Sequence, residues 1–244
     1  MQRIHLSVDD SLSVFRELTE NADKCGSAFC CPRLAYYKAL HEKYGAKITL
    51  YCFARDGVFD IGNSTGKFAN ELSENASWLR FGFHSADPDA NMLIAPFEES
   101  AEAYKYVTRE LKRITGGAPT SALRLHYFAA STRLRRFLAE NGVKALLGAD
   151  DDRVSYSLAP ETDAKLKLCG QCRDTETGLH IYRTMARLEK CADVSAALSE
   201  ARNAYPEAPL VVFTHDRLPQ GIARMEETAR FGMENGLEFG LEDE

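Results

Sequence analysis

The chain has 244 residues, of which 45% are hydrophobic and 27% are charged, a balance sufficient for one large α/β domain with a sizeable core. The formal net charge is −6 and both signs are spread along the chain, which argues against a nucleic-acid-binding protein with a basic patch. No apolar run approaches the ~18 residues of a membrane span, and no charged leader precedes an apolar segment. We therefore expect a cytoplasmic protein that neither binds nucleic acid nor spans a membrane.

The cysteines favour the same compartment. There are seven of them, an odd number, and free thiols in a reducing environment are the simplest interpretation. Cys169 and Cys172 form a single C-x-x-C in a stretch that we expect to be a polar loop. One such pair is weak evidence for a structural zinc site, which requires four ligands. We interpret both as incidental free cysteines.

Segments typical of strands and helices alternate along almost the whole chain. Short β-branched or apolar runs indicate buried strands, and apolar residues spaced by three and four indicate helices. The clearest helix is 97–115, which ends at a pair of glycines. The expected strands are 4–8, 47–53, 79–83, 122–126, 143–147, 154–158, 179–182, 209–214 and 237–239. The expected helices are 33–44, 66–77, 97–115, 131–141, 193–205 and 219–235, with a polar loop before residue 33 and an irregular insertion at 160–178.

This alternation predicts an α/β fold in which parallel strands are joined by right-handed crossovers. At this length, a distorted (β/α) barrel with about seven parallel strands fits better than two domains. No linker or repeat divides the chain, so residues 1–244 are expected to form a single domain. A doubly wound open sheet is the alternative, but the first strand ends in Asp-Asp rather than in a glycine-rich dinucleotide-binding turn.

Four of the expected strands run directly into chemically capable side chains. In a parallel barrel the carboxyl ends of the strands share one face, where active sites form. Each cluster alone has an ordinary structural interpretation: an Asp-Asp-Ser turn in solvent, or a histidine in the core or at its rim. Their convergence on one face favours an enzyme. The clusters are Asp9 and Asp10, His84, Arg124 with His126 and Tyr127, and His215; His5, His41 and His180 are expected to be structural.

These residues resemble the motifs of polysaccharide deacetylases, the carbohydrate esterases that share the NodB-like domain. The resemblance covers nearly the whole chain, and the motifs occur in the expected order. The family patterns are T-F-D-D, H-[ST]-x-x-H, R-x-P-Y, an Asp-rich segment and L-x-H. The matching segments are Ser7 to Asp10, His84 to Pro88, Arg124 to Tyr127, Asp150 (with Asp151 or Asp152 as substitutes) and Phe213 to His215.

The resemblance implies a distorted (β/α) barrel and a role for each matched residue. Asp10 and His84 would bind a divalent metal, most often zinc, which polarises the carbonyl of the substrate and lowers the pKa of a bound water. The remaining roles concern proton transfer and charge stabilisation. Asp9 would be the general base, and Arg124 would keep this base ionised. The backbone N–H of Tyr127 would stabilise the oxyanion. His215 would be the general acid, and the carboxylate of Asp150 would orient it.

Two departures from the family pattern affect the metal site. The second histidine of the second motif is replaced by Pro88, which cannot ligate a metal through its side chain. The proline of the third motif is replaced by His126. Catalytic zinc normally has three protein ligands, so a third ligand must come from elsewhere. The candidates are Asp87, Asp89 and His126, and the exchange at His126 suggests that it compensates for the lost histidine.

The leading functional hypothesis is a metal-dependent hydrolase that acts on a carbon–nitrogen bond outside peptides. It would remove acetyl from an N-acetylated or O-acetylated sugar, and a small sugar or short glycan suits a cytoplasmic enzyme. Trp78 could stack on a sugar ring, although core packing is the alternative. Another C–N substrate remains open because specificity is expected to lie in loops such as 11–32 and 160–178. The second hypothesis is a carbohydrate-binding or small-ligand-binding barrel with a degenerate metal site, for which Pro88 is the argument.

Overall fold

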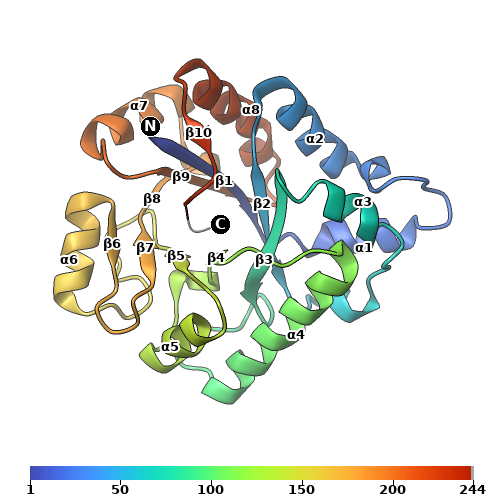
Figure 1. Ribbon diagram of the computed structural model, residues 1–244, viewed down its shortest axis with the longest axis horizontal. Helices are drawn as coiled ribbons and strands as arrows, with labels where there is room; N and C mark the ends of the chain where they lie inside the picture. Colours follow the sequence, from blue (N-terminus) through green and yellow to red (C-terminus); the bar gives the residue numbers. More distant parts are fainter. Residues whose placement is uncertain (243–244) are drawn as a thin grey trace.

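The centre of the fold is strand β1, Arg3–Asp9, which has parallel neighbours on both edges in the computed structural model (Figure 1). The structure describes residues 1–242. The first sheet has the order β3-β2-β1-β9-β8, and β10 pairs with the first residues of β1. All its pairings are parallel, as the alternating sequence pattern predicts. Its further strands are β2 Ile48–Phe53, β3 Leu79–Ser85, β8 Thr184–Arg187, β9 Leu210–His215 and β10 Glu238–Phe239.

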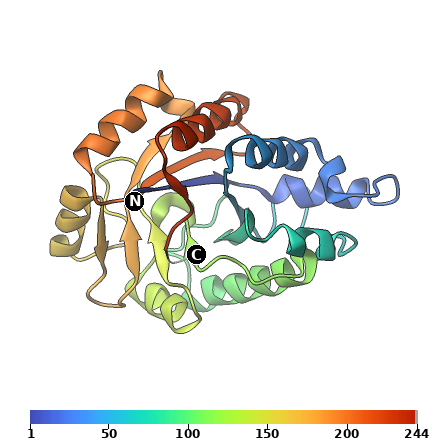
Figure 2. The same ribbon diagram turned by 45° about the horizontal axis from the view of Figure 1, so that its top comes forward.

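A second sheet, in the order β4-β5-β7-β6, continues the ring of strands. It contains β4 Ala122–Leu123, β5 Ala145–Leu147, β7 His180–Tyr182 and the antiparallel edge strand β6 Gln171–Arg173. The N–H of Thr120 donates to the carbonyl of Phe81 at 2.9 Å, and the Thr184 hydroxyl donates to the carbonyl of Gly148 at 2.5 Å. These bonds join the sheets at two seams, so the strands form the predicted distorted barrel with helices outside (Figures 1 and 2).

The helices form where the sequence combines an apolar stripe with a capping residue at the start of the helix or a glycine at its end. In α4, buried Tyr104, Val107, Leu111 and Ile114 follow the three-and-four spacing, and Gly116 ends the helix with a φ of 67°. The carboxylate of Asp193 caps α7 by accepting from the N–H of Ala196 at 2.8 Å. The bounds are α1 Leu12–Glu20, α2 Pro32–Tyr44, α3 Ala69–Glu74, α4 Phe97–Thr115, α5 Thr132–Glu140, α6 Pro160–Cys169, α7 Val194–Ala204 and α8 Pro219–Glu234.

Several expectations for local structure were wrong. The segment expected to be a polar loop contains α1, whose buried Leu12, Phe15 and Leu18 form an apolar stripe. Residues 154–158 form no strand, because Tyr156 and Ser157 have φ values of 57° and 51° that end an extended conformation. The insertion at 160–178 is not irregular either, since it holds α6 and β6. Strand β8 was not predicted, and α3 is shorter than the expected helix.

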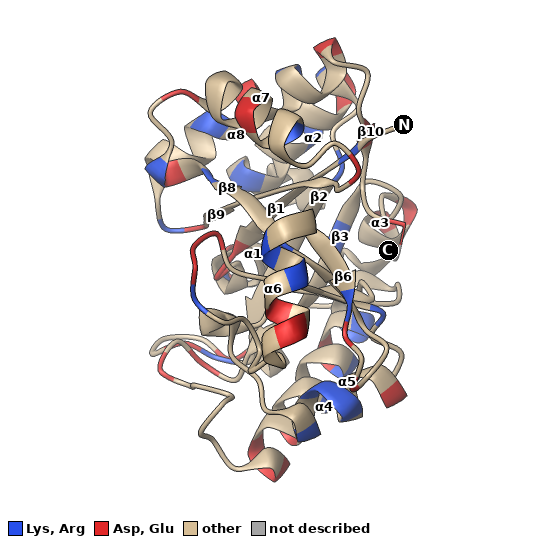
Figure 3. Ribbon diagram, turned by 90° about the vertical axis from the view of Figure 1, so that its left-hand side faces the viewer, with Lys and Arg blue, Asp and Glu red and all other residues tan. Residues whose placement is uncertain are grey.

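The interior of the molecule is well separated from its charged exterior. Strands β2 and β9 are buried on both faces over most of their length, as expected for parallel strands covered by helices. Trp78 belongs to this interior: it is 4% exposed and stacks on His41 at 4.7 Å, so its role is core packing and not sugar stacking. Basic and acidic residues lie interspersed along the outer helices (Figure 3). Within residues 1–242, no helix has the length and apolar character needed to cross a bilayer.

Gly82 on β3 provides a direct test of barrel packing. A Cβ at this position would lie 2.7 Å from a methyl carbon of Thr120 and 2.9 Å from the Tyr51 ring. Because overpacking a close-packed interior forces its neighbours to shift, Gly82→Ala is expected to lower the free energy of unfolding by about 1–3 kcal/mol in urea denaturation. Gly57→Ala is the control, since no atom of the described residues lies within 4 Å of a Cβ at that position. Equal stability of the two variants would contradict this account.

Candidate active site

A cavity of about 460 Å³ opens where the strands β1, β3, β4 and β9 end. It lies at the carboxyl ends of the strands, the face on which the sequence placed the site. Side chains from opposite ends of the chain, such as Asp9 and His215, share its wall. The predicted residues that the structure brings together here are Asp9, Asp10, His84, Arg124, His126, Tyr127 and His215.

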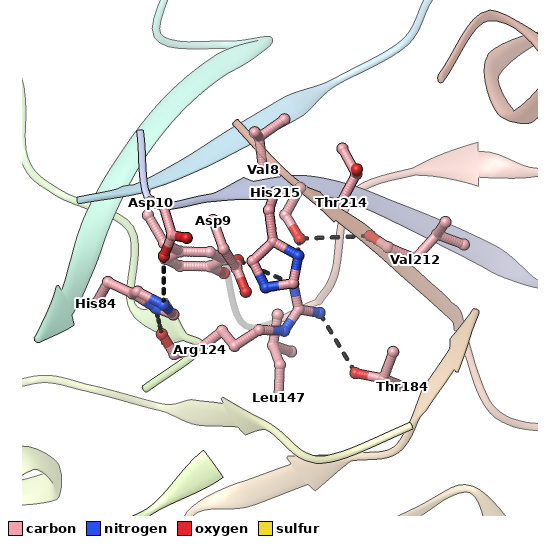
Figure 4. A network of polar contacts seen from close by, with 12 residues as sticks. Val8, Asp9, Asp10, His84, Arg124, Leu147, Thr184, Val212, Thr214 and His215 are labelled. Atoms are coloured by element: carbon pink, nitrogen blue, oxygen red, sulfur yellow. Dashed lines mark hydrogen bonds and ion pairs between the residues drawn. The ribbon is translucent and has the colours of Figure 1, made fainter. Parts of the chain in front are cut away.

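His84 has a fixed orientation at the end of β3. Its ring is buried, and Nδ1–H donates to the backbone carbonyl of Arg124 at 2.6 Å. Nε2 therefore faces Asp10, whose Oδ1 lies 3.5 Å away (Figure 4). Burial alone would lower the pKa of His84, but the charge of Asp9 and the hydrogen bond and charge of Asp10 raise it. The negative field at Nε2 thus favours a cation at this point.

Asp10 reaches this position through an unusual backbone conformation. Its φ of 62° lies in the left-handed region, which turns the side chain away from that of Asp9. Burial alone would raise the pKa of Asp10, but His84, followed by His215 and Arg217, lowers it on balance. Oδ1 is buried, and its nearest polar neighbour among the described residues is His84 Nε2, 3.5 Å away, too far for a short hydrogen bond. A buried carboxylate oxygen with so little compensation is a suitable ligand for a metal ion.

His126 completes the group, and its tautomer is also set by a backbone carbonyl. Nε2–H donates to the carbonyl of Pro88 at 3.0 Å, which leaves the lone pair of Nδ1 directed at His84 Nε2, 3.2 Å away. Burial, and then the charge of His84, lowers the pKa of His126 to about 4, so its ring is neutral near pH 7. A neutral imidazole whose other nitrogen donates to a carbonyl has the form that ligates metals in proteins.

Asp10, His84 and His126 could together hold a divalent ion. Their ligand atoms lie within 4.8 Å of one another, and they are the one such group of three among residues 1–242. For metal–ligand bonds of 2.0–2.1 Å, tetrahedral geometry requires ligand atoms about 3.4 Å apart. The observed separations of 3.2 and 3.5 Å from His84 Nε2 to its two neighbours match that requirement.

The two aspartates considered as the third ligand do not join this group. Asp87 accepts the N–H of Asp89 within its own turn and lies 3.5 Å from Arg55, so its carboxylate is engaged elsewhere. Asp89 lines the cavity but lies outside the cluster. The turn presents the carbonyl of Pro88 to the site in place of a side chain, and His126 uses that carbonyl.

Beside this group, Asp9 is held by the fully buried guanidinium of Arg124. Arg124 Nη1 lies 3.3 Å from Asp9 Oδ1 and donates to the Ser7 hydroxyl at 2.6 Å. Nη2 donates to the Thr184 hydroxyl at 3.4 Å, and the guanidinium lies 4.2 Å from the centre of the Phe213 ring. Figure 4 shows Arg124 extending among the ends of these strands toward Asp9. The carboxylate is thereby fixed in the cavity wall next to the candidate metal ligands.

The carboxylate that orients His215 is Glu189, which the sequence analysis missed. Glu189 Oε1 lies 2.5 Å from His215 Nδ1, and the Thr214 hydroxyl donates to the other oxygen at 2.9 Å. Asp150, expected in this role, instead pairs with Arg187 and lies 3.5 Å from Lys190 Nζ. Glu189 follows β8 directly, so recognising that short strand would have revealed another acidic residue at a strand end.

Tyr127 occupies the rim of the cavity in a strained conformation. Its φ of 58° is left-handed, its side chain is half exposed, and its hydroxyl donates to the Pro88 carbonyl at 3.3 Å. His126 and Tyr127 therefore share one acceptor, which couples the short turn His126–Phe128 to the loop that follows β3. This turn places Tyr127 in the lining of the cavity.

Solved structures with the same arrangement of elements include two deacetylase-type enzymes. "T48 deacetylase with substrate" has a TM-score of 0.52 at 12% identity, over 98% of this chain and 87% of that one. The family 4 carbohydrate esterase from Streptomyces lividans, in complex with acetate, has a TM-score of 0.51 at 12% identity, over 98% and 92%. This chain has the polysaccharide deacetylase fold. The resemblance inferred from the motifs is thus supported at the level of fold.

The same fold occurs with a different chemistry. A 4-alpha-glucanotransferase from Thermococcus litoralis has a TM-score of 0.57 at 13% identity, and this chain covers 40% of its length. No protein-family model and no curated protein sequence matches the chain. The fold alone therefore leaves the reaction open, and the residues of the cavity must carry the functional argument.

The pairing of Glu189 with His215 predicts a pH-dependent contribution to stability. Burial alone would raise the pKa of Glu189, but the hydrogen bond from His215 lowers it below the ordinary value of 4.5. A carboxylate with a lowered pKa stabilises the fold fully above its unfolded pKa and loses that contribution as the pH falls through its folded pKa. Glu189→Gln should therefore cost about 1.5–3 kcal/mol near pH 7, because a hydrogen bond to a charged group is lost.

That cost should shrink as the pH falls below 4.5, because the wild-type carboxylate becomes protonated as the pH falls through its lowered folded pKa. Urea denaturation from pH 3.5 to 7 measures the difference between the two proteins. Glu98→Gln is the control, because Glu98 is exposed and its partner Arg133 lies 3.0 Å away on the surface. A pH-independent difference for Glu189→Gln would show that its charge does not stabilise the fold.

Proposed function

We propose that this protein is a divalent-metal-dependent hydrolase that removes acetyl from an N-acetylated or O-acetylated sugar. The observation that carries the proposal is the convergence of two imidazoles and one carboxylate with their lone pairs directed at one point. Each imidazole donates its other N–H to a backbone carbonyl, of Arg124 and Pro88 respectively. Such outer hydrogen bonds fix the tautomer that a metal requires. This arrangement supports a metal site in which His126 replaces the usual second histidine of the family.

Zinc is the metal that best fits this set of ligands. Two histidines and one carboxylate form a common catalytic zinc site, with the fourth position left to water or substrate. When bound, the ion would polarise the acetyl carbonyl and make water more acidic. The ligands would be His84 and His126 through nitrogen and Asp10 through oxygen.

Asp9 would act as the general base in this mechanism. It is buried beside the candidate ligand group and ion-paired to Arg124, which holds the carboxylate in one orientation. A base in this position can take a proton from a water molecule in the cavity. The backbone N–H of Tyr127 would stabilise the developing oxyanion of the substrate.

His215 would act on the leaving group. It lines the cavity and its Nδ1 is bound by Glu189, so Nε2 is the nitrogen available to deliver a proton to the departing amine or hydroxyl. Glu189 would fix the orientation of the ring, which is the role expected earlier of Asp150. Asp9 is held by Arg124 and His215 by Glu189, so proton uptake and proton release would use separate groups and both could act in one cycle.

The alternative of a binding barrel with a broken metal site rested on Pro88. That argument is weakened, because Pro88 contributes a carbonyl that holds His126 in the form suited to a metal. Asp9, Arg124 and His215, which such a protein would not need for binding alone, all remain in contact with the cavity.

Metal binding provides the first test. The wild type should bind one zinc ion per chain, and His126→Ala should bind it at least about tenfold more weakly, since loss of one of three ligands leaves an incomplete site. Competition with a chromophoric chelator measures both affinities. Asp87→Ala is the matched control, because Asp87 pairs with Arg55 outside the ligand group. Unchanged zinc affinity in His126→Ala would end the proposal that this residue is the third ligand.

Acetate release from a panel of acetylated amino sugars provides the second test. With zinc bound, Asp9→Asn should lower kcat by about 10²- to 10⁴-fold, because an amide cannot accept the proton of the attacking water. Zinc affinity of that variant should stay near the wild-type value, since Asp9 is not in the ligand group. Full activity of Asp9→Asn, or a wild type inactive on every member of the panel, would contradict the proposed reaction.

A further inference from the structure

The cavity wall carries more positive charge than deacetylation of a neutral sugar requires. Four arginines line it, namely Arg124, Arg153, Arg187 and Arg217, whereas three aspartates do so. The chain as a whole has the opposite balance, with a formal net charge of −6. A bound divalent ion would add two further positive charges to the same wall. Among the side chains that line the cavity, arginines thus outnumber carboxylates by one, and such a wall suits a ligand that brings negative charge.

Two of the four arginines already have partners within the proposed catalytic group. Arg124 is fully buried against Asp9, and Arg217 lies 3.6 Å from Asp10. Arg153 and Arg187 have no part in the reaction as proposed. Their presence in the wall is therefore the feature that needs another explanation.

Arg153 and Arg187 are held in place by adjacent carboxylates. Arg153 binds both oxygens of Asp151 at 2.7–3.0 Å, and Arg187 pairs with Asp150. Asp150 is also 3.5 Å from Lys190 Nζ, so this group contains three cations and two carboxylates. The arginines are thus oriented without being fully neutralised.

Aromatic rings of the cavity support the same two side chains. The guanidinium of Arg187 lies 5.1 Å from the centre of the Phe213 ring, and that of Arg153 lies 5.8 Å from the centre of the Phe128 ring. Phe128 and Phe213 both line the cavity. Stacking restricts a guanidinium to few orientations, which reduces the entropy lost when it binds a ligand.

We propose that the substrate carries an anionic group, a carboxylate or a phosphate, and that Arg153 and Arg187 bind it. The planar guanidinium fork matches the oxygens of either group, whereas sugar hydroxyls need no fixed positive charge. The inference rests on the proposed function for the position of the acetyl group. It adds that the enzyme selects an acidic or phosphorylated sugar over a neutral one.

The test compares three probes that share one sugar: methyl N-acetylglucosaminide, its 6-phosphate, and the corresponding uronide with a 6-carboxylate. Binding to the zinc-loaded protein is measured by calorimetry, and acetate release is measured separately. One of the anionic probes should bind about 10- to 100-fold more tightly than the neutral one, since each charged hydrogen bond contributes about 1.5–3 kcal/mol. The anionic probe with the higher affinity identifies the anion as phosphate or carboxylate.

Variants then assign the preference to the two arginines. Arg153→Gln changes an exposed side chain and should remove most of the preference while leaving the neutral probe unaffected. Arg187→Lys keeps the charge beside Asp150 but loses the fork, and it should weaken the anionic probes alone. Arg133→Gln, on the surface of α5 and paired with Glu98, is the control and should keep the full preference.

The outcomes separate this inference from the proposed function. Equal binding of all three probes, or a preference that survives both Arg153→Gln and Arg187→Lys, would overturn the anionic-substrate inference even if acetate is released. Absence of acetate release from every probe would instead count against the deacetylase proposal, while a preference that depends on these two arginines would still support the anion site.

Discussion

The buried guanidinium of Arg124 is the interaction on which this site depends. Placing a permanent charge inside the barrel is costly unless it is paired and hydrogen-bonded. Ser7 and Asp9 on β1, Thr184 on β8 and the Phe213 ring on β9 provide that compensation. The same residue holds His84 through its backbone carbonyl. One residue thus links the two sheets, fixes the candidate base with its side chain and fixes a candidate metal ligand with its main chain.

The two departures from the deacetylase pattern, Pro88 and His126, are structurally linked. At position 88 a side-chain ligand is absent, but the carbonyl of Pro88 accepts from His126 Nε2. That bond directs Nδ1 of His126 toward His84, where a third ligand is needed. Proline cannot donate a backbone hydrogen bond, but its carbonyl is as good an acceptor as any other. In the proposed metal site, the ligand lost at position 88 would be regained at His126, with the Pro88 carbonyl setting the tautomer.

The sequence predicted strand positions and site residues correctly where the pattern within a single strand was sufficient. Strands β1, β3 and β9 are rich in apolar residues and lead into the site residues, so their positions and the convergence of those residues could be predicted. The four residues of β8 alternate in burial and gave no such signal. Missing β8 hid Glu189 and left Asp150 as the apparent partner of His215. The true partner of His215 is the carboxylate that the fold turns toward it. The distance in sequence from a strand end does not determine which carboxylate that is.

The likeness to both deacetylases and a glucanotransferase shows why the wall of the cavity matters more than the barrel. The fold brings strand ends together, and the reaction depends on the side chains found at those ends. Here the half of the cavity around Asp10, His84 and His126 suits a cation, whereas the part formed by Arg153 and Arg187 suits an anion. Asp151 pairs with Arg153 and Asp150 pairs with Arg187, which restrains both guanidiniums at the cavity wall. A ligand that satisfies both parts must present an acyl oxygen to the first and a negative group to the second. This separation of charge across one cavity would select a substrate by its orientation as well as by its composition.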